Sequence, residues 1–552
     1  MTDLLEFVGG LLDGLGLVAL AIMIGGIGYT LTILRIRCGG LPYQNRLGAL
    51  ALSFTFYGAL ALGGVRFLQL LLKPLALADA TSFWALERFI RTHVFQLNAV
   101  SLGLICLLAV QLERARRSPA RRGIWLGILL TLAAFLVNEA GLSHASSRLA
   151  DGTVLMVGTI VHVLGATIWA GGIVHLLLSW HALKKHEDAA TSVWPQLVAR
   201  FSPLGIVSMM LVVSGGSYLA WQYVGAWHGL LGTGYGNMLL VKIGLFIGIM
   251  GLAALNLFAG RRWVRTGSTS SMTTAVPIYI QVEIVLAIAM LFSASTLTSF
   301  PPAVDVLEAA ATPQEVWTMF SPKLPHLAGP EQVMIEAPEL TDLRTGTVGR
   351  KPDMSWDRFN HNASGVIVLI LAGLALLDWS GRVTWARHWP MLFVAFSLLI
   401  IVFANPDHWP LGPASFWESF QSTEVVQHWL AGGVVFGLGW FEWWARRCQA
   451  ASSHVRFVFP ILCIAGGIIL LTHSHSINEL KTEFLVQSTH VAMGWLGVLA
   501  GCGRWMELQL PPPQARMAGL FSIIAIMLVG WILLFYINPE LPEPVGSASI
   551  EG

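Results

Sequence analysis

Histidine is the residue type of this chain with the most obvious capacity for chemistry. The sequence contains 16 histidines, and several lie near the ends of long apolar runs, where polar groups are not expected. A polar side chain inside a bilayer is costly without a partner, so such residues are candidates for function. Neutral imidazole is a common ligand of zinc, copper and iron. Histidines at a similar depth on several helices could therefore converge on one ion or one macrocycle.

Two stretches of the chain share a histidine pattern. In the first, "NEAGLSHASS" places His144 before the His162 of "VHVLGATIWAGG"; in the second, "THSHS" places His473 and His475 before the His490 of "HVAMGWLGVLAG". Each pattern would set one imidazole at the end of a helix and another about two turns into the next helix. Glycines follow the inner histidine each time, and small residues let helices approach closely. The pattern predicts a metal site at each hairpin. The alternative is that the Ser-His pairs cap helix ends and the glycines serve ordinary packing.

The second half of the chain offers the larger group of candidate ligands. They are predicted to lie on four helices at one depth, and they are His361, His428, His473, His475 and His490. Three or four imidazoles could bind a copper ion. Alternatively, His361, His428 and His490 could supply the axial ligands of haem b between facing helices. His473 and His475 differ by two positions, so on a regular helix they point apart and at most one would join the group.

The first half offers a smaller group of candidate ligands, namely His93, His144 and His162. His93 opens an apolar run, His144 follows one, and His162 lies inside one. This arrangement predicts a second metal site on the same side as the first. His175 lies deeper in the run that holds His162, and it could be a further station for an ion or only a packing residue with satisfied hydrogen bonds.

Acidic and basic residues inside the apolar runs need partners. Glu139 could orient a ligating imidazole, relay protons, or pair with Lys242, which is an isolated lysine in another run. Glu283 is a second acid of this kind, with Lys242 or an arginine at the inner end as possible partners. The sequence leaves these pairings open.

Long apolar runs must position all these residues. Hydrophobic residues make up 55% of the chain and charged residues only 12%, against about 25% charged residues in soluble domains. About 20 apolar residues cross a bilayer as a helix, and the alternating pattern of a membrane β-barrel is missing from the sequence. The predicted fold is an all-α, polytopic helical membrane protein with about 14 transmembrane helices. The predicted spans lie near 14–34, 47–72, 93–112, 124–142, 153–180, 203–224, 236–258, 276–298, 360–378, 389–404, 424–444, 457–473, 484–503 and 517–537.

Basic residues predict the orientation of these helices. They gather in alternate connections, at Arg35, Arg37, Arg114, Arg116, Arg117, Arg121, Arg122, Lys184, Lys185, Arg261, Arg262, Arg265, Arg382, Arg387, Arg446, Arg447, Arg456 and Arg504. Positive residues favour the cytoplasmic side, so both termini are predicted to lie outside. This predicts a multi-pass membrane protein surrounded by lipid, with termini that are periplasmic if the organism is a Gram-negative bacterium. It also places the candidate histidine sites on the outer face.

A polar stretch divides the chain into two membrane domains. Residues 300–358 are rich in Pro, Glu and Asp and fall on the predicted outer side. We therefore expect an eight-helix membrane domain at 1–299, a periplasmic linker at 300–358 and a six-helix membrane domain at 359–552. The linker is short for a domain, and it could cover the outer face or only connect the two halves.

Several functional classes lack support in the sequence. The five cysteines form no CxxC pair, which argues against a zinc ribbon, a thioredoxin-type site and c-type haem attachment. There is no GxxxxGK[ST] motif and no glycine-rich turn between a strand and a helix, so an ATP-driven pump on this chain is not expected. No nucleic-acid partner is expected either. The sequence leaves open whether the protein is an enzyme.

Particular segments of the chain resemble a known family. The sequence over roughly 130–302, which includes "VHVLGATIWAGGIVHLLL", "RFSPLGIVSMMLVVSGGSYLAW" and "GYGNMLLVKIGLFIGIMGLAALN", is similar to the bacterial copper resistance protein D (CopD) family. The second half, with "WDRFNHNASG", "DHWPLGP", "VVQHWLAGG" and "GRWMEL", resembles the C-terminal membrane extension found in some members. The resemblance implies an inner-membrane protein linked to copper tolerance or copper delivery, with a periplasmic copper chaperone as a conceivable partner.

The ligand types of this chain depart from a simple copper importer. Cu(I) prefers thiolate and thioether ligands, but the methionines form only the doublet Met209-Met210 and no paired clusters. Imidazoles on the outer face would instead suit Cu(II), zinc or haem iron. We therefore expect a protein that binds copper through outward-facing histidines and either moves the ion across the membrane or delivers it to a partner. The alternative is a b-type haem membrane protein that transfers electrons and could reduce a metal.

Overall fold

The structure is a computed structural model, and it describes residues 2–36, 43–80, 83–148, 151–327, 340–341, 348–349, 354–406, 408–447, 454–472 and 480–539. The chain forms two compact units, which comprise Met1–Leu230 with Met238–Asp305, and Leu231–Asn237 with Val306–Gly552. Each unit is described separately below.

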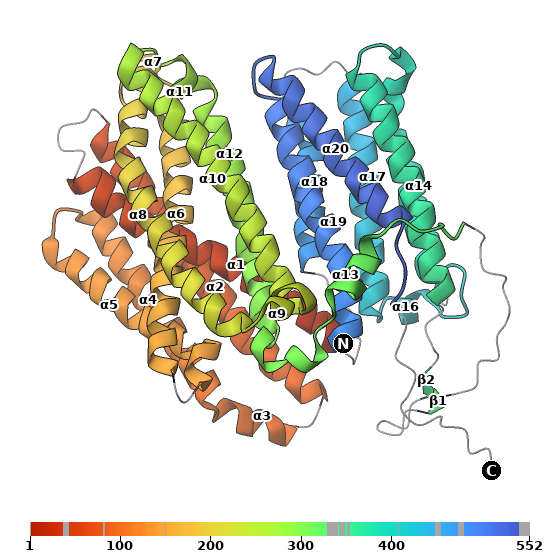
Figure 1. The fold of residues 1–552 in the computed structure, drawn as a ribbon. Helices are drawn as coiled ribbons and strands as arrows, with labels where there is room; N and C mark the ends of the chain where they lie inside the picture. The colour runs from red at the N-terminus through yellow and green to blue at the C-terminus, as the bar shows by residue number, and fades with distance from the viewer. Residues whose placement is uncertain are drawn as a thin grey trace. The chain divides into compact units, whose positions relative to one another are not determined.

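The first unit is built from long helices (Figure 1). Its helices are α1 (Thr2–Tyr29, continued by a π-helix at Thr30–Ile36), α2 (Gln44–Ala80), α3 (Phe83–Ile90), α4 (His93–Arg117), α5 (Arg122–Gly141), α6 (Gly152–Leu183), α7 (Glu187–Ser192), α8 (Trp194–Val224), α11 (Ser270–Thr274) and α12 (Val276–Ser299). Helices α9 (Trp227–Gly232) and α10 (Gly234–Thr266) each include residues of both units, and short 3-10 turns occur at His144–Ser147 and Ala303–Asp305. Helix α1 packs against α2, α6 and α12, and so occupies the middle of the unit.

Close helix contact between α1 and α6 depends on glycine. A Cβ atom built on Gly171 would lie 1.8 Å from the carbonyl oxygen of Ala21, and one on Gly25 would lie 2.4 Å from the Cα of Gly171. The two backbones therefore touch, as in the small-residue interfaces of other membrane helices. The same contact lies about one helical turn from His175 on α6.

Replacing Gly171 by leucine should destabilise the first unit, because the new side chain would collide with backbone atoms that cannot turn aside. We expect a loss of about 3 kcal/mol, as for severe overpacking of a core. Thermal unfolding of the purified protein followed by circular dichroism would measure it. Gly103→Ala on α4 is the matched control, since nothing lies within 4 Å of a Cβ atom there. Equal melting curves for the two variants would contradict the prediction.

The second unit is a closed ring of six helices. Its long helices are α14 (Met354–Trp379), α15 (Met391–Phe403), α17 (Thr423–Arg447), α18 (Val458–Leu471), α19 (Leu480–Glu507) and α20 (Gln514–Leu534). Each packs against the next in this order, and α20 packs against α14. Shorter elements are α13 (Pro313–Phe320), α16 (Phe416–Ser419), the antiparallel strands β1 (Leu340–Thr341) and β2 (Val348–Gly349), and 3-10 turns at Leu307–Ala309, Thr384–His388 and His454–Phe457.

Part of the predicted linker packs on this ring. Helix α13 contacts α19, and Glu315 of α13 forms an ion pair with Lys481 of α19 at 2.5 Å. The hydrogen bond from Lys481 holds the pKa of Glu315 below its usual value. Further along, the backbone N–H of His326 donates to Oδ1 of the buried Asn362 at 2.7 Å. This part of the linker therefore lies against the N-terminal parts of α14 and α19.

Buried ion pairs fasten the opposite end of the ring. Glu442 of α17, which is 1% exposed, accepts hydrogen bonds from Arg446 at 2.8 Å and from Arg504 of α19 at 2.6 Å. Arg446 also pairs with Asp378 of α14, and Arg504 pairs with Glu507 at 2.7 Å. Three helices are thus connected through charges that have little access to solvent.

The predicted fold class is confirmed: the chain is a polytopic all-α membrane protein. Each of the fourteen predicted spans coincides with a helix. Among the described residues, twelve helices are long and apolar enough to cross a membrane. Helix α15 falls short because its 13 residues reach only about 20 Å, against the ~30 Å thickness of a hydrocarbon core. Helix α17, which carries Gln427 and His428, is also outside the twelve. The orientation of the termini stays a prediction.

Candidate functional site

Two of the predicted histidines are in ring contact at one end of the six-helix ring, and a third lies within electrostatic range of one of them. The ring of His361 on α14 lies 5.5 Å from that of His490 on α19, centroid to centroid, and the two planes are nearly perpendicular at 86°. Tyr536, which follows α20, stacks on His361 at 3.9 Å and 20°. His428 on α17 is close enough to His361 to interact with it electrostatically. Each residue lies near the predicted outer end of its helix, and their role as ligands stays a prediction.

A carboxylate accompanies these imidazoles. Asp357 precedes His361 by one helical turn, and its Oδ1 lies 3.0 Å from Nδ1 of His361. The hydroxyl of Tyr536 donates to the other carboxylate oxygen at 3.1 Å. Asp357 also interacts electrostatically with His490 and His428. A negative charge among three imidazoles favours a cation, and a carboxylate bonded to a ligating histidine is a common orienting arrangement in metal sites. We call Asp357, His361, His428, His490 and Tyr536 the histidine cluster.

Hydrogen bonds fix the tautomers of the three imidazoles. Nδ1 of His361 lies 2.8 Å from the carbonyl oxygen of Asp357, Nδ1 of His428 lies 2.7 Å from Oδ1 of Asn405, and Nδ1 of His490 lies 3.1 Å from the carbonyl oxygen of Val486. These oxygens only accept, so each Nδ1 is a donor. In the neutral ring the lone pair then lies on Nε2. All three imidazoles therefore have the tautomer that ligates through Nε2.

The cluster is an incomplete coordination shell as it stands. Over the residues that the structure describes, no three His, Cys, Asp or Glu side chains are already arranged to hold a metal ion. Ion binding would require the Nε2 atoms to move closer together. The predicted ligands His473 and His475 lie outside the described residues.

The first-half histidines make separate contacts. His93 is exposed at the first residue of α4. His144 is exposed in a 3-10 turn, where its Nε2 lies 3.0 Å from the carbonyl oxygen of Thr298. Nδ1 of His162 lies 3.0 Å from the carbonyl oxygen of Val212 on α8. None of the recorded contacts in the described part of the chain joins two of these three imidazoles.

The charged side chain near the imidazoles has opposite sign in the two histidine groups. Lys242 of α10 interacts electrostatically with His162, whereas Asp357 interacts with the second-half imidazoles. A nearby ammonium group opposes the binding of a metal cation, and a nearby carboxylate favours it. The second unit therefore offers the better environment for a cation.

The acids within the apolar runs have partners that the sequence did not reveal. Glu139 forms an ion pair with Arg66 of α2 and accepts a hydrogen bond from Ser101 of α4, so the suggested pairing of Glu139 with Lys242 is wrong. Glu283 accepts a hydrogen bond from Nδ2 of Asn256 at 2.7 Å. Arg66 lies in a predicted span, so its charge also needs a partner there. This feature of the sequence could have suggested that Arg66 pairs with Glu139.

His175 is a packing residue with both ring nitrogens in hydrogen-bonding contact. Its Nδ1 lies 2.7 Å from the carbonyl oxygen of Gly171, and its Nε2 lies 3.2 Å from the hydroxyl oxygen of Thr55. The side chain is fully buried beside the rings of Tyr29 and Phe54. This environment supports the interpretation of His175 as a satisfied core histidine.

Comparisons with known proteins agree with the family resemblance. Residues 195–297 match the family described as Copper resistance protein D. The chain is also 28% identical over 220 residues to a protein of Bacillus subtilis (strain 168) named Copper transport protein CutJ, and the match covers 39% of each chain. The chain thus spans well under half the length of this relative. No solved structure matches the present chain. The chain is therefore a copper-related membrane protein whose residues 195–297 match the copper resistance protein D family.

Proposed function

We propose that this protein handles copper at the outer face of the bacterial inner membrane, and that the histidine cluster is where it takes up the ion. The proposal is supported by the ring contact between His361 and His490 and by the carboxylate of Asp357 beside His361. His428 lies within electrostatic range of His361 and Asp357. Imidazole nitrogens suit Cu(II) better than Cu(I). From the cluster the ion would cross the membrane or pass to a partner, for which a periplasmic copper chaperone is a candidate. The name of the Bacillus relative, Copper transport protein CutJ, supports movement across the membrane.

The remaining predicted ligands stay part of the proposal. His473 and His475 follow α18 in the sequence and could supply a further ligand to the cluster. His93, His144 and His162 would form a second, weaker site in the first unit, because Lys242 opposes a cation beside His162.

The haem alternative fits the cluster less well than a bare ion. Two axial histidines must face each other across a porphyrin. The rings of His361 and His490 instead meet edge to face, and Tyr536 covers one face of His361. A porphyrin does not fit between these two rings in this arrangement.

Elemental and optical analysis of the purified full-length chain tests the proposal. We expect stoichiometric copper after loading with Cu(II) and dialysis, and no Soret absorption band. A Soret band that disappears in His428→Ala or His490→Ala would overturn the copper assignment in favour of haem b. Copper uptake into sealed vesicles, compared with empty vesicles, would then separate transport from delivery to a partner.

Copper binding should weaken as the pH falls. Protons compete with the metal for imidazole lone pairs, and histidine ordinarily titrates near pH 6.5. We expect the apparent affinity for Cu(II) to fall steadily from about pH 7.5 to about pH 5.5. Competition with a chromophoric chelator at each pH would measure it, with the affinity of the chelator corrected at the same pH. A constant affinity over this interval would contradict imidazole ligation.

A further inference from the structure

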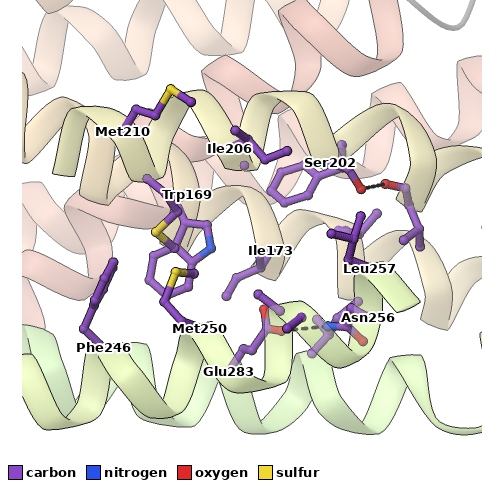
Figure 2. A pocket seen from close by; sticks show the side chains of 18 of the residues that line it. Trp169, Ile173, Ser202, Ile206, Met210, Phe246, Met250, Asn256, Leu257 and Glu283 are labelled. Atoms are coloured by element: carbon purple, nitrogen blue, oxygen red, sulfur yellow. Dashed lines mark hydrogen bonds between the residues drawn. The ribbon is translucent and has the colours of Figure 1, made fainter. Parts of the chain in front are cut away.

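The first unit contains a cavity that the copper proposal does not use. The cavity measures about 650 Å³ and lies between α6, α8, α10 and α12 (Figure 2). Most of its lining comes from α8, α10 and α12, within the segment that matches the family. Its size falls in the range of small-molecule sites, about 300–1,000 Å³.

The mouth of the cavity lies between two helices that are long and apolar enough to cross a membrane. Residues of α6 form the floor of the cavity and are buried; Trp169, for example, is 3% exposed. Residues of α8 at the edge of the cavity are exposed to the surroundings, and Met210 is 65% exposed. Leu257 of α10 is exposed on the other edge. Because α8 and α10 are membrane spans, an opening between them leads into the hydrocarbon of the bilayer. A ligand would therefore enter through the membrane.

One end of the cavity is polar. Glu283 is 3% exposed and accepts a hydrogen bond from Nδ2 of Asn256 at 2.7 Å. Figure 2 shows the second carboxyl oxygen of Glu283 turned into the cavity. Within the described residues, Oδ1 of Asn256 is buried without a hydrogen-bond partner. Buried polar groups inside a membrane are expensive, and an incompletely bonded pair calls for a ligand or a function.

The shape and chemistry of the cavity limit what can occupy it. Glu283 lies seven residues after the first residue of α12, Val276, which is about 10 Å along the helix, so a charged lipid headgroup would be badly placed. The apolar walls include the rings of Trp169, Phe201 and Phe246, and aromatic rings pack well on other flat rings. A carboxyl and an amide offer both donors and acceptors at the far end.

We propose that this cavity binds a neutral, lipid-soluble ring compound with hydrogen-bonding oxygens, of the quinone or quinol class. Its ring would lie among the aromatic side chains and one of its oxygens would meet Glu283 and Asn256. This site is independent of the histidine cluster, so either proposal can fail without the other.

Titration with decylubiquinone in lipid nanodiscs tests the site. Quinones quench tryptophan fluorescence, and Trp169 lines the cavity. We expect saturable quenching that weakens at least tenfold in Ala253→Phe, because Ala253 lines the cavity and a phenyl group would fill it. Ile247→Phe is the matched control on α10, since Ile247 is 65% exposed and outside the lining. It should bind like the unmodified protein.

A double variant separates ligand binding from stability. Glu283→Leu with Asn256→Leu removes both polar partners together, which leaves no buried group unpaired and should preserve or raise the melting temperature. The same variant should lose at least tenfold in quinone affinity. Non-saturable quenching, or equal affinity in Ala253→Phe and Ile247→Phe, would overturn the proposal. A phospholipid that co-purifies with the protein and is lost in Ala253→Phe would also overturn it. The same holds for a bound Cu(I) ion that is lost when Met209 and Met250 are both changed to leucine.

Discussion

Replacing His361 and His490 together by alanine should lower the affinity of the protein for Cu(II) by at least about 100-fold. The two imidazoles lie next to each other, with ring centroids 5.5 Å apart, and alanine removes both Nε2 lone pairs. Losing a group that only orients a ligand already costs about 10–100-fold in metal affinity. A loss of 100-fold corresponds to about 2.7 kcal/mol of binding free energy. Competition with a chelator of known affinity at constant pH would measure it.

Two further variants make this result specific. Asp357→Asn keeps the shape of the side chain but removes its charge, and it should weaken Cu(II) binding by about 10-fold, the lower end for an orienting carboxylate. His228→Ala is the control, because His228 is an exposed histidine of α9 outside the cluster. Full copper binding in the His361→Ala, His490→Ala double variant, with monodisperse protein, would show that the ion binds elsewhere and would overturn the proposed site.

Replacing Arg504 by methionine should destabilise the second unit by about 3 kcal/mol. Arg504 donates to Glu442 at 2.6 Å and to Glu507 at 2.7 Å, and Glu442 is almost fully buried. Without Arg504, Glu442 keeps its pair with Arg446 but loses one of its two charged partners. Removing one partner of a buried ion pair costs far more than the pair itself contributes. Reversible unfolding in mixed micelles would give the change in free energy.

A second substitution should reverse most of this loss. Glu442→Leu in the Arg504→Met background removes the carboxylate that has lost one of its partners, while Arg446 keeps its pair with Asp378. Apolar replacements of a whole buried pair are often neutral or stabilising. Arg117→Met is the control, because Arg117 forms an exposed pair with Glu113, and it should leave the unfolding curve unchanged. If the double variant is no more stable than Arg504→Met alone, the buried network is not the reason for the loss.

The sequence by itself determined the helices and where His361, His428 and His490 lie along them. Hydrophobicity over about 20 residues decides whether a segment spans a bilayer, and every predicted run is indeed helical. A helix rises by about 1.5 Å per residue, so the position of His361, His428 or His490 within its run already placed it near one end of the ring. The similarity of residues 195–297 to the copper resistance protein D family is likewise evident from the sequence alone.

Only the tertiary structure decided which helices are neighbours and which way each one faces. The apolar runs are hydrophobic on most sides, so they carry little information about rotation or about partners distant in the chain. Asp357 and Tyr536 joined the histidine cluster because α14 packs against α20 in a closed ring. The partners Arg66 for Glu139 and Asn256 for Glu283 followed from long-range packing in the same way. The lipid-facing cavity exists because four helices leave space that no local pattern in the sequence encodes.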